Sequence, residues 1–438
     1  MKPKHIKKIL LSEIRRISSN PKEYCINPKT DFTRTRKLPL EQLIRCIVGM
    51  GGGTLSNELL DFFQCSSDAA SSSAFVQQRH KVKSEAFEAV FKGFSNQLLS
   101  CMDNGMKLLA VDGSDIQIPV NPDDSASYFP GANGQKPYNL LHLNALYDLE
   151  HRIYTDVIIQ KRREENEHKA FTDMIDRSDI PCALVLTDRG YESYNNMAHL
   201  QEKGWKFLMR IKDGNTGIKS SFTLPETDEF DIDIKLLITR KQTKEIKVLL
   251  KDKNHYRFLA STSPFDYLPL KSKCKEPAQF YELKFRIVRF KLSEDSYETV
   301  LTNLEQEQYP AEKLKELYAL RWGIETSFRD LKYTIGMLKF HSKKVMCVLQ
   351  EIYAHLIMYN FAEMITSHVV IEKKQRKHLY KANFSVAVHM CRRFYQGNTS
   401  PPNLEAVIAR HLLPVRPNRH RERKLTQKVF QGFLYRIA

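Results

Sequence analysis

Residues 108–118 read LLAVDGSDIQI, an apolar run that meets two aspartates and then alternates between apolar and polar side chains. This composition and alternation predict a β-strand. Two more β-rich stretches follow at 139–147 and 153–160, so we expect a meander of three strands joined by short turns. After them the sequence predicts a polar helix over 166–176, an apolar strand over 183–186, a helix over 193–203 and a strand over 206–211.

This order of three antiparallel strands followed by parallel crossovers is the order of the ribonuclease H-like fold. In that fold the first and fourth strands are neighbours, so Asp112 in the first strand and Asp188 just past the fourth are expected to meet. Carboxylates beside apolar strands are poor core residues and good ligands for Mg²⁺ or Mn²⁺. The alternative is that both are turn-forming aspartates without a ligand.

Asp115 competes with Asp112 for the same role. The two residues lie on opposite faces of a pleated strand, so only one of them is expected to point at a metal. We choose Asp112 because it directly follows the apolar run.

A long helix is predicted from Pro310 to about Ile335. At about 100° per residue, one stripe about 60° wide holds Tyr318, Arg321, Glu325 and Lys332. The adjoining apolar face, which suits packing on a sheet, consists of Leu317, Leu320, Ile324, Phe328, Leu331 and Ile335. A carboxylate, cations and an aromatic side chain beside a buried face are what a phosphodiester site requires. The alternative is an exposed face of i, i+4 ion pairs.

The first hundred residues are predicted to be helical, over 6–17, 39–49, 55–63 and 84–99. Residues 51–54 read GGGT, but no Gly-Lys-Ser/Thr follows, so we expect a turn with Ser56 as helix cap rather than a phosphate loop. Residues 71–83 gather hydroxyls, amides and bases. They suit equally a helix-turn-helix reader of DNA and a solvated basic helix face.

The stretch from 216 to 303 is again β-rich and predicts an inserted β domain. Its expected strands are 231–238, 245–250, 256–260, 282–290 and 299–303. Another helix is predicted over 344–367, and the chain then becomes strongly basic. Residues 373–378 read KKQRKH, and residues 410–438 carry eight Lys or Arg against a single acidic residue, Glu422.

The composition bounds the class of protein. With 438 residues, of which 42% are hydrophobic, the chain is expected to be globular and multidomain. Its formal net charge of +17 favours a polyanionic partner, nucleic acid first and an anionic membrane second. The longest apolar stretch, 352–365, contains His355, Asn360 and Glu363, so no membrane span is expected. With no secretory signal either, we expect a cytoplasmic protein.

The histidines and cysteines do not point to zinc. None of them occurs at the spacing of a zinc site. Glu164, Glu165, Glu167 and His168 form a polar cluster at the start of a predicted helix. We expect them to interact with the helix dipole and to face water. The alternative is that they contribute to the carboxylate site.

The spacing Tyr318-x2-Arg321-x3-Glu325-x6-Lys332 resembles the Y-(2)-R-(3)-E-(6)-K signature of bacterial insertion-sequence DDE transposases of the IS-four type. Residues 112–114 and 188–191 resemble the two Asp motifs of that family, and residues 300–304 resemble the strand that leaves its β insertion. The resemblance extends from about residue 75 to about residue 360.

The resemblance implies a ribonuclease H-like catalytic core in which Asp112, Asp188 and Glu325 hold two Mg²⁺ ions, with Mn²⁺ as a substitute. It further implies that Arg321 and Lys332 grip DNA phosphates and that Tyr318 contacts the backbone of the transposon end. Trp322, at the border of the same stripe, either stacks on a displaced base or packs against the protein.

The fold class that follows is α/β, and we divide the chain into five regions. They are a helical DNA-binding region (1–100), the first part of the core (101–215), the β-rich insertion (216–309), the second part of the core (310–370) and a basic, helical C-terminal region (371–438). The expected function is DNA transposition, with double-stranded transposon ends and target DNA as partners and a homodimer pairing two ends. The alternatives are a transposase-derived DNA-binding protein without catalysis, and a nuclease on the same core.

Overall fold

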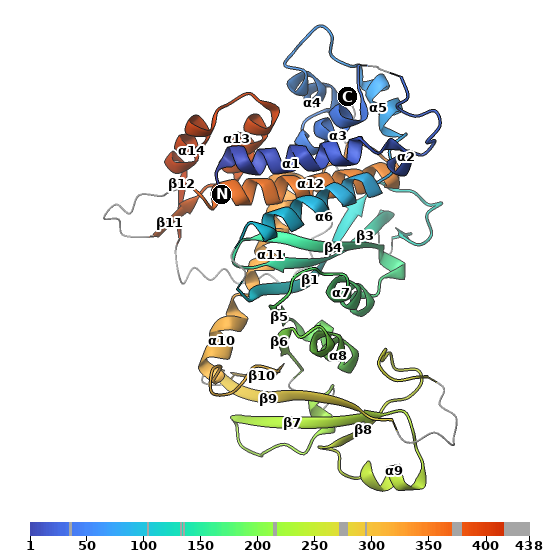
Figure 1. Ribbon diagram of the computed structural model, residues 1–438, viewed down its shortest axis with the longest axis vertical. Coiled ribbons are helices and arrows are strands. Elements are labelled where there is room, and N and C mark those ends of the chain that lie inside the picture. Colours follow the sequence, from blue (N-terminus) through green and yellow to red (C-terminus); the bar gives the residue numbers. More distant parts are fainter. Residues whose placement is uncertain are drawn as a thin grey trace.

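A large mixed sheet runs through the computed structural model, which describes residues 1–34, 37–102, 105–131, 134, 136–212, 217–270, 279–293, 296–369 and 379–415 (Figure 1). The strands of its first half follow the β-rich stretches of the sequence closely. They are β1 (Lys107–Ile118), β2 (Tyr128–Phe129), β3 (Tyr138–Asp148), β4 (Ile153–Lys161), β5 (Ala183–Thr187) and β6 (Lys206–Arg210).

The pairing of these strands brings the two Asp motifs to one place. β1 pairs antiparallel with β3 and parallel with β5, and β5 pairs parallel with β6. The expected neighbourhood of the first and fourth long strands is therefore confirmed. The parallel register joins Ala110 to Leu186, so Asp112 and Asp188 each lie two residues beyond the same rung. Two motifs that are far apart in the sequence thus lie level with each other, where β5 ends beside the middle of β1.

The β-rich second half extends the same sheet. β10 (Ser296–Thr302) pairs antiparallel with β6, and the order continues through β9 (Tyr281–Ser293), β7 (Phe230–Thr239) and β8 (Tyr256–Phe258). Figure 1 shows β7, β8 and β9 at the end of the molecule opposite to the helical part. The expected strand over 245–250 is wrong, because these residues belong to helix α9 (Lys244–Leu249).

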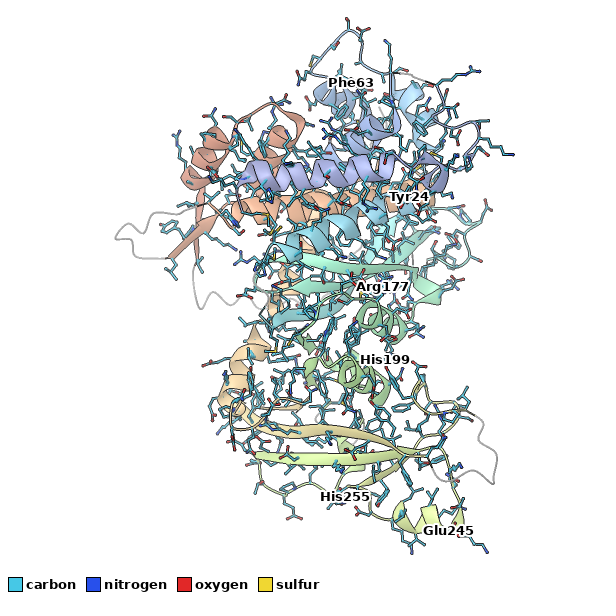
Figure 2. All side chains as sticks on the ribbon, viewed as in Figure 1. Tyr24, Phe63, Arg177, His199, Glu245 and His255 are labelled. Carbon is cyan, nitrogen blue, oxygen red and sulfur yellow. The ribbon has the colours of Figure 1, made fainter. Side chains whose placement is uncertain are left out.

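Local capping explains that difference. The Thr243 hydroxyl accepts a hydrogen bond from the backbone N–H of Ile246, as at a helix N-cap. Within the helix only Ile246 is buried, whereas Glu245 is exposed at the far end of the molecule (Figure 2). One buried side chain in six residues fits a short surface helix, although the alternation of charged and apolar residues resembles a strand.

Helices cover both faces of the first half of the sheet. On one face α7 (Glu167–Asp176) and α8 (Tyr194–Glu202) pack over Leu109 and Val111. On the other face Ala110 and Ile116 pack in the core that also holds α6 (Glu85–Ser100) and α12 (Val345–Thr366). Even-numbered residues of β1 therefore face α12, and odd-numbered ones face α7. This parity decides which side chains can meet.

The N-terminal helices form one core with α12 and lie on the side of it that faces away from the sheet (Figure 1). They are α1 (Pro3–Ser18), α2 (Pro21–Tyr24), α3 (Leu40–Gly49), α4 (Leu55–Phe62) and α5 (Ser72–Arg79). Arg79, in the stretch considered as a DNA reader, is buried and pairs with Glu351 of α12 at 2.7 Å. Helix α4 is capped by Thr54 and not by Ser56 as expected, because the Thr54 hydroxyl accepts from the backbone N–H of Asn57.

The remaining elements follow α12. They are β11 (Leu379–Ala382), α13 (Phe384–Gln396), α14 (Pro401–Arg410) and β12 (Leu412–Val415), with β11 and β12 paired antiparallel. In the described part of the chain, no helix is long and apolar enough to cross a membrane. The basic run 373–378 and residues 416–438 of the basic tail lie outside the described residues.

The predicted single helix over 310–335 is wrong in detail. The structure has α10 (Ala311–Ala319), α11 (Trp322–Arg329) and a π-helical turn (Asp330–Ile335). At the joint the Arg321 N–H bonds to the Tyr318 carbonyl at 3.0 Å, a tight i to i+3 bond. The tight bond at the joint and the wide π-helical turn both change the rotation per residue. The four residues Tyr318, Arg321, Glu325 and Lys332 therefore do not form one continuous stripe, as they would on a uniform α-helix.

Candidate active site

Asp112 is the carboxylate that β1 delivers to the face covered by α11. Its Oδ1 accepts a hydrogen bond from the Gly113 N–H at 2.9 Å. Burial raises the pKa of Asp112 to about 6, opposed by the Gly113 N–H and Arg321 and assisted by Glu325 and Asp188. Asp112 is therefore a buried carboxylate whose pKa is raised chiefly by burial, with Arg321, Glu325 and Asp188 as its charged neighbours.

Asp188 follows β5 and opens the short 3₁₀ turn Arg189–Tyr191. Its Oδ1 accepts from the Arg189 N–H at 2.8 Å, so the turn holds the carboxylate at the end of the strand. The Tyr318 hydroxyl donates to the same oxygen at 3.4 Å. Helix α10 thus contacts the second Asp motif directly.

Arg321 joins the three predicted catalytic carboxylates. Its guanidinium is 2.8 Å from Glu325 Oε1, 3.9 Å from Asp112 Oδ2 and 4.0 Å from Asp188 Oδ2. The residue is 2% exposed. One cation thus lies among three acidic groups that come from β1, the end of β5 and α11.

The other residues of the predicted stripe do not all lie at the same place. Tyr318 is buried beside Arg321, at 5.7 Å from the guanidinium carbon to the ring centre. Trp322 is 48% exposed, and its ring centre is 5.4 Å from the same carbon. Lys332 is half-buried in the π-helical turn, where burial lowers its pKa against the opposing effect of Asp115. The structure thus brings Tyr318, Arg321 and Glu325 together, and Asp115 is the acidic group that influences Lys332.

Glu298 of β10 is an acidic neighbour that the sequence analysis missed. It is buried and pairs with Arg210 of β6 at 2.6 Å. Burial raises its pKa, and Asp188 and Arg321 are among the charges that act on it. Its only signal in the sequence is a glutamate at an inward position of an otherwise apolar strand.

A second polar cluster lies across β1 from this site. Asp115 points away from Arg321, as expected, and contacts His142 of β3. Glu165 and Glu167 also contact His142, so the expectation that both face water is wrong. The reason is the register between β3 and β1, which places His142 beside the loop that precedes α7. Glu164 and His168 are exposed, as expected.

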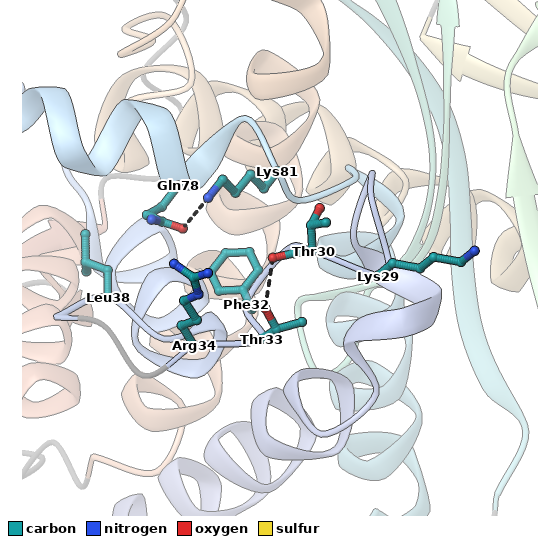
Figure 3. Close-up of a pocket in the computed structure, with 8 residues that line it drawn as sticks. All are labelled: Lys29, Thr30, Phe32, Thr33, Arg34, Leu38, Gln78 and Lys81. Atoms are coloured by element: carbon teal, nitrogen blue, oxygen red, sulfur yellow. Dashed lines mark hydrogen bonds between the residues drawn. The ribbon is translucent and has the colours of Figure 1, made fainter.

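A basic pocket of about 400 Å³ opens in the N-terminal helical part, away from the carboxylates (Figure 3). Its charged lining residues are Lys29, Arg34 and Lys81. Lys81 donates to Gln78 Oε1 at 3.3 Å. Phe32, with a φ of 54°, turns the chain beneath the pocket. This basic lining suits an anionic ligand.

Comparison with known proteins identifies the family of this chain. The model of a family described as "Transposase DDE domain" matches residues 103–361, which include all three carboxylates. The chain belongs to this family. Its members are transposases, so the chain is an enzyme that cuts DNA and transfers strands, and the family implies use of a divalent metal.

Two curated relatives narrow the type. The chain is 23% identical over 344 residues to the transposase InsG for insertion sequence element IS4 of Escherichia coli (strain K12), covering 75% of this chain and 70% of the relative. It is also 23% identical over 373 residues to the transposase for insertion sequence element IS231F of Bacillus thuringiensis subsp. israelensis, covering 78% and 75%. The chain is therefore a DDE transposase of the IS4 type.

One solved structure is similar over most of its length. The cryo-EM structure of a piggyBac transposase synaptic complex with hairpin DNA matches with a TM-score of 0.44 and 12% identity, covering 95% of this chain and 86% of that one. This similarity is too low to transfer any feature of that complex.

Proposed function

We propose that this transposase binds the terminal inverted repeats of an insertion sequence, cuts the DNA there and joins the ends to a target, with Asp112, Asp188 and Glu325 as its catalytic carboxylates. The observation that carries the proposal is their convergence on Arg321, within 4.0 Å in each case. Three acidic groups from separate elements have no structural need to meet at one cation, because Glu325 alone neutralises the charge of Arg321.

The donor set fits divalent magnesium. Three carboxylates against one guanidinium leave an excess of negative charge, and the raised pKa of Asp112 reflects its burial among these groups. Carboxylate oxygens are the ligands preferred by Mg²⁺ and Mn²⁺. When bound, two such ions would activate the attacking oxygen and stabilise the leaving oxygen of an in-line displacement.

The chain's own residues prepare this centre. Arg321 keeps the carboxylates close together, and the Tyr318 hydroxyl orients Asp188. Trp322 offers an exposed aromatic face beside the site, suited to stacking on an unpaired base. Lys332 supplies a cation for a DNA phosphate. The strand order β4-β3-β1-β5-β6 supports a ribonuclease H-like core as the frame for these groups.

We assign DNA binding to the regions outside this core. Residues 1–100 carry the basic pocket, and residues 371–438 carry the basic C-terminal sequence. Residues 101–215 and 310–370 would form the core, and 216–309 the insertion that lengthens its sheet. Two protomers would pair the two transposon ends.

The test uses neutral replacements of the same shape, namely Asp112→Asn, Asp188→Asn and Glu325→Gln. Each is expected to reduce Mg²⁺-dependent cleavage of end-containing DNA by at least about 1000-fold, because each removes a charged group that acts as part of one unit. Binding to the same DNA, measured by gel shift in EDTA, should stay within about twofold. The matched control, Asp173→Asn, changes an exposed carboxylate of α7 and should cut normally.

Retained cutting by any of the three variants would overturn its assignment. Strand transfer is measured separately by the joining of pre-cut ends to a plasmid. Cleavage without any joining by the wild-type protein would identify a nuclease instead of a transposase.

A further inference from the structure

We infer that Asp115, His142 and Glu165 form a second metal site, which takes a divalent first-row transition metal ion and lies on the sheet face opposite the catalytic carboxylates. One ligand atom from each residue lies within 4.8 Å of the other two. The site shares no residue with the proposed catalytic centre. Its role would also differ, because a metal here would stabilise β1 from the face opposite to the catalytic carboxylates.

The register of the sheet builds the site. Asp115 of β1 and His142 of β3 are directly paired, and both are on the face covered by α7. His142 Nδ1 is 2.7 Å from Asp115 Oδ1 and 3.3 Å from Glu165 Oε2. Zinc lies about 2.0–2.2 Å from such ligands, so atoms about 3 to 3.5 Å apart can share one ion after small movements.

One unsatisfied buried oxygen lies in the same cluster. His142 is 5% exposed, and its ring nitrogens lie 2.7 Å from Asp115 Oδ1 and 2.9 Å from Glu167 Oε1. Glu165 Oε2 is buried without a hydrogen-bond partner among the described residues, with His142 Nδ1 3.3 Å away, and its other oxygen pairs with Arg162. Buried polar atoms of this kind are costly, and a bound cation would remove the cost for the carboxylate oxygen.

The outer contacts are those of a metal-binding histidine. His142 Nε2 is 2.9 Å from Glu167 Oε1, in the first turn of α7. A histidine that binds metal through one ring nitrogen commonly donates its other N–H to a carboxylate, which fixes the ring. A Cβ atom at Gly113 would overlap His142 Nε2 and lie 2.8 Å from Glu167 Oε1. The backbone beside catalytic Asp112 thus approaches the cluster closely.

The mixed donor set selects the class of ion. One imidazole nitrogen with carboxylate oxygens suits Zn²⁺, Mn²⁺ or Co²⁺ better than Mg²⁺, which prefers oxygen alone. Arg162 is the internal competitor, at 3.0 Å from Asp115 Oδ1. Its side chain is about one-third exposed, so it can turn toward solvent when an ion enters.

The test uses Co²⁺ as a probe, since its visible absorption reports a nitrogen and oxygen coordination shell. The full-length protein is stripped with EDTA and carries Asp188→Asn and Glu325→Gln, so that the proposed catalytic site cannot compete. We expect one Co²⁺ per chain and a rise in the unfolding temperature on binding. Glu165→Gln and His142→Asn in this background should each weaken Co²⁺ binding at least about 10-fold.

Two controls keep the result interpretable. Glu164→Gln alters the exposed neighbouring glutamate and should bind Co²⁺ like the parent. The partly exposed Glu165→Gln variant should also keep the unfolding temperature of the parent in EDTA, within about 2 °C, because its replacement is isosteric. No Co²⁺ uptake by the parent, or uptake unchanged by both Glu165→Gln and His142→Asn, would overturn the inference.

Discussion

At the residue scale, Arg321 has an unusual set of neighbours. It is buried and faces three carboxylates, of which only Glu325 is at ion-pair distance below 3 Å. The carboxylates are themselves between about one-quarter and two-fifths exposed, so solvent screens part of their repulsion. Arg321 therefore acts as an internal counter-ion for a site that needs more positive charge than it contains.

This leads to a prediction for Arg321→Met. Removing the cation should destabilise the protein in EDTA by about 1–3 kcal/mol, less than for a fully buried pair because of the screening. Saturating Mg²⁺ should then raise the unfolding temperature of the variant more than that of the wild type, because the carboxylates lack their own counter-ion. Arg329→Met, on the exposed side of α11, is the control. Equal Mg²⁺ shifts in wild type and Arg321→Met would contradict the assigned role.

Substitution of Trp322 distinguishes two interpretations of its exposed ring. If it stacks on an unpaired base, Trp322→Ala should lower affinity for DNA with a splayed base at the cut by about 5- to 100-fold. Its unfolding free energy should change by less than about 0.5 kcal/mol, because nearly half of the side chain is exposed. Trp322→Phe should recover most of the affinity. A loss of stability with unchanged affinity would instead assign the ring to packing.

At the scale of elements, α12 ties the N-terminal helices to the sheet. Glu351 on this helix pairs with Arg79 of α5 and accepts from the His341 N–H at 3.0 Å. Burial alone would raise the pKa of Glu351, but Arg79 and His341 lower it to about 2. The charged form is thus strongly favoured in the folded protein, and the pair holds two distant segments together.

The pH dependence of stability follows from this shift. The folded-state pKa lies below the ordinary value of 4.5, so the contribution of Glu351 is present above pH 4.5 and is lost as the pH falls toward 2. Glu351→Gln should cost about 3–5 kcal/mol at pH 7, because Arg79 stays buried without its partner, and should flatten the acid limb of the stability profile. Urea unfolding at several pH values measures both effects.

The exposed pair of Lys37 and Asp68 provides the control, since Asp68→Asn should lower the unfolding free energy by less than about 1 kcal/mol. An equal loss for Glu351→Gln and Asp68→Asn would contradict the role assigned to Glu351.

The elements also show what the sequence can and cannot predict. The apolar runs before Asp112 and Asp188 predicted the two strands correctly, because burial and alternation are local properties. That the strands are neighbours was predicted from the order of strands and helices along the chain, and their pairing confirms it. The joint at Leu320 and the π-helical turn after Arg329 could not be predicted from a constant angle per residue. The contact between His142 and Glu167 depends on a strand register that no single segment encodes.

At the scale of the whole molecule, the proposed catalytic carboxylates and the basic pocket occupy different places. The carboxylates gather where β5 ends beside the middle of β1, and the basic pocket lies in the N-terminal helical part. In the sequence, the last 23 residues, 416–438, carry seven Lys or Arg against Glu422. An acidic centre inside a protein of net charge +17 requires that the DNA be held by other surfaces. Among the regions that we propose to bind DNA, the basic tail has the densest run of Lys and Arg in the sequence.

Two variants test the contribution of that tail. One ends at Val415, and the other keeps the full length but replaces the seven Lys and Arg residues beyond Val415 by Gln. Both should bind DNA more weakly and with a smaller salt dependence, since each lost phosphate contact lowers the slope of log K against log salt by about 0.9. Because phosphate contacts do not read sequence, the loss should be similar for end-containing and unrelated DNA. Cleavage at saturating protein should stay near the wild-type rate, as the carboxylates are untouched.

A loss of affinity confined to end-containing DNA would instead mean that the tail reads the terminal sequence. An unchanged slope of log K against log salt would exclude the tail from the DNA interface.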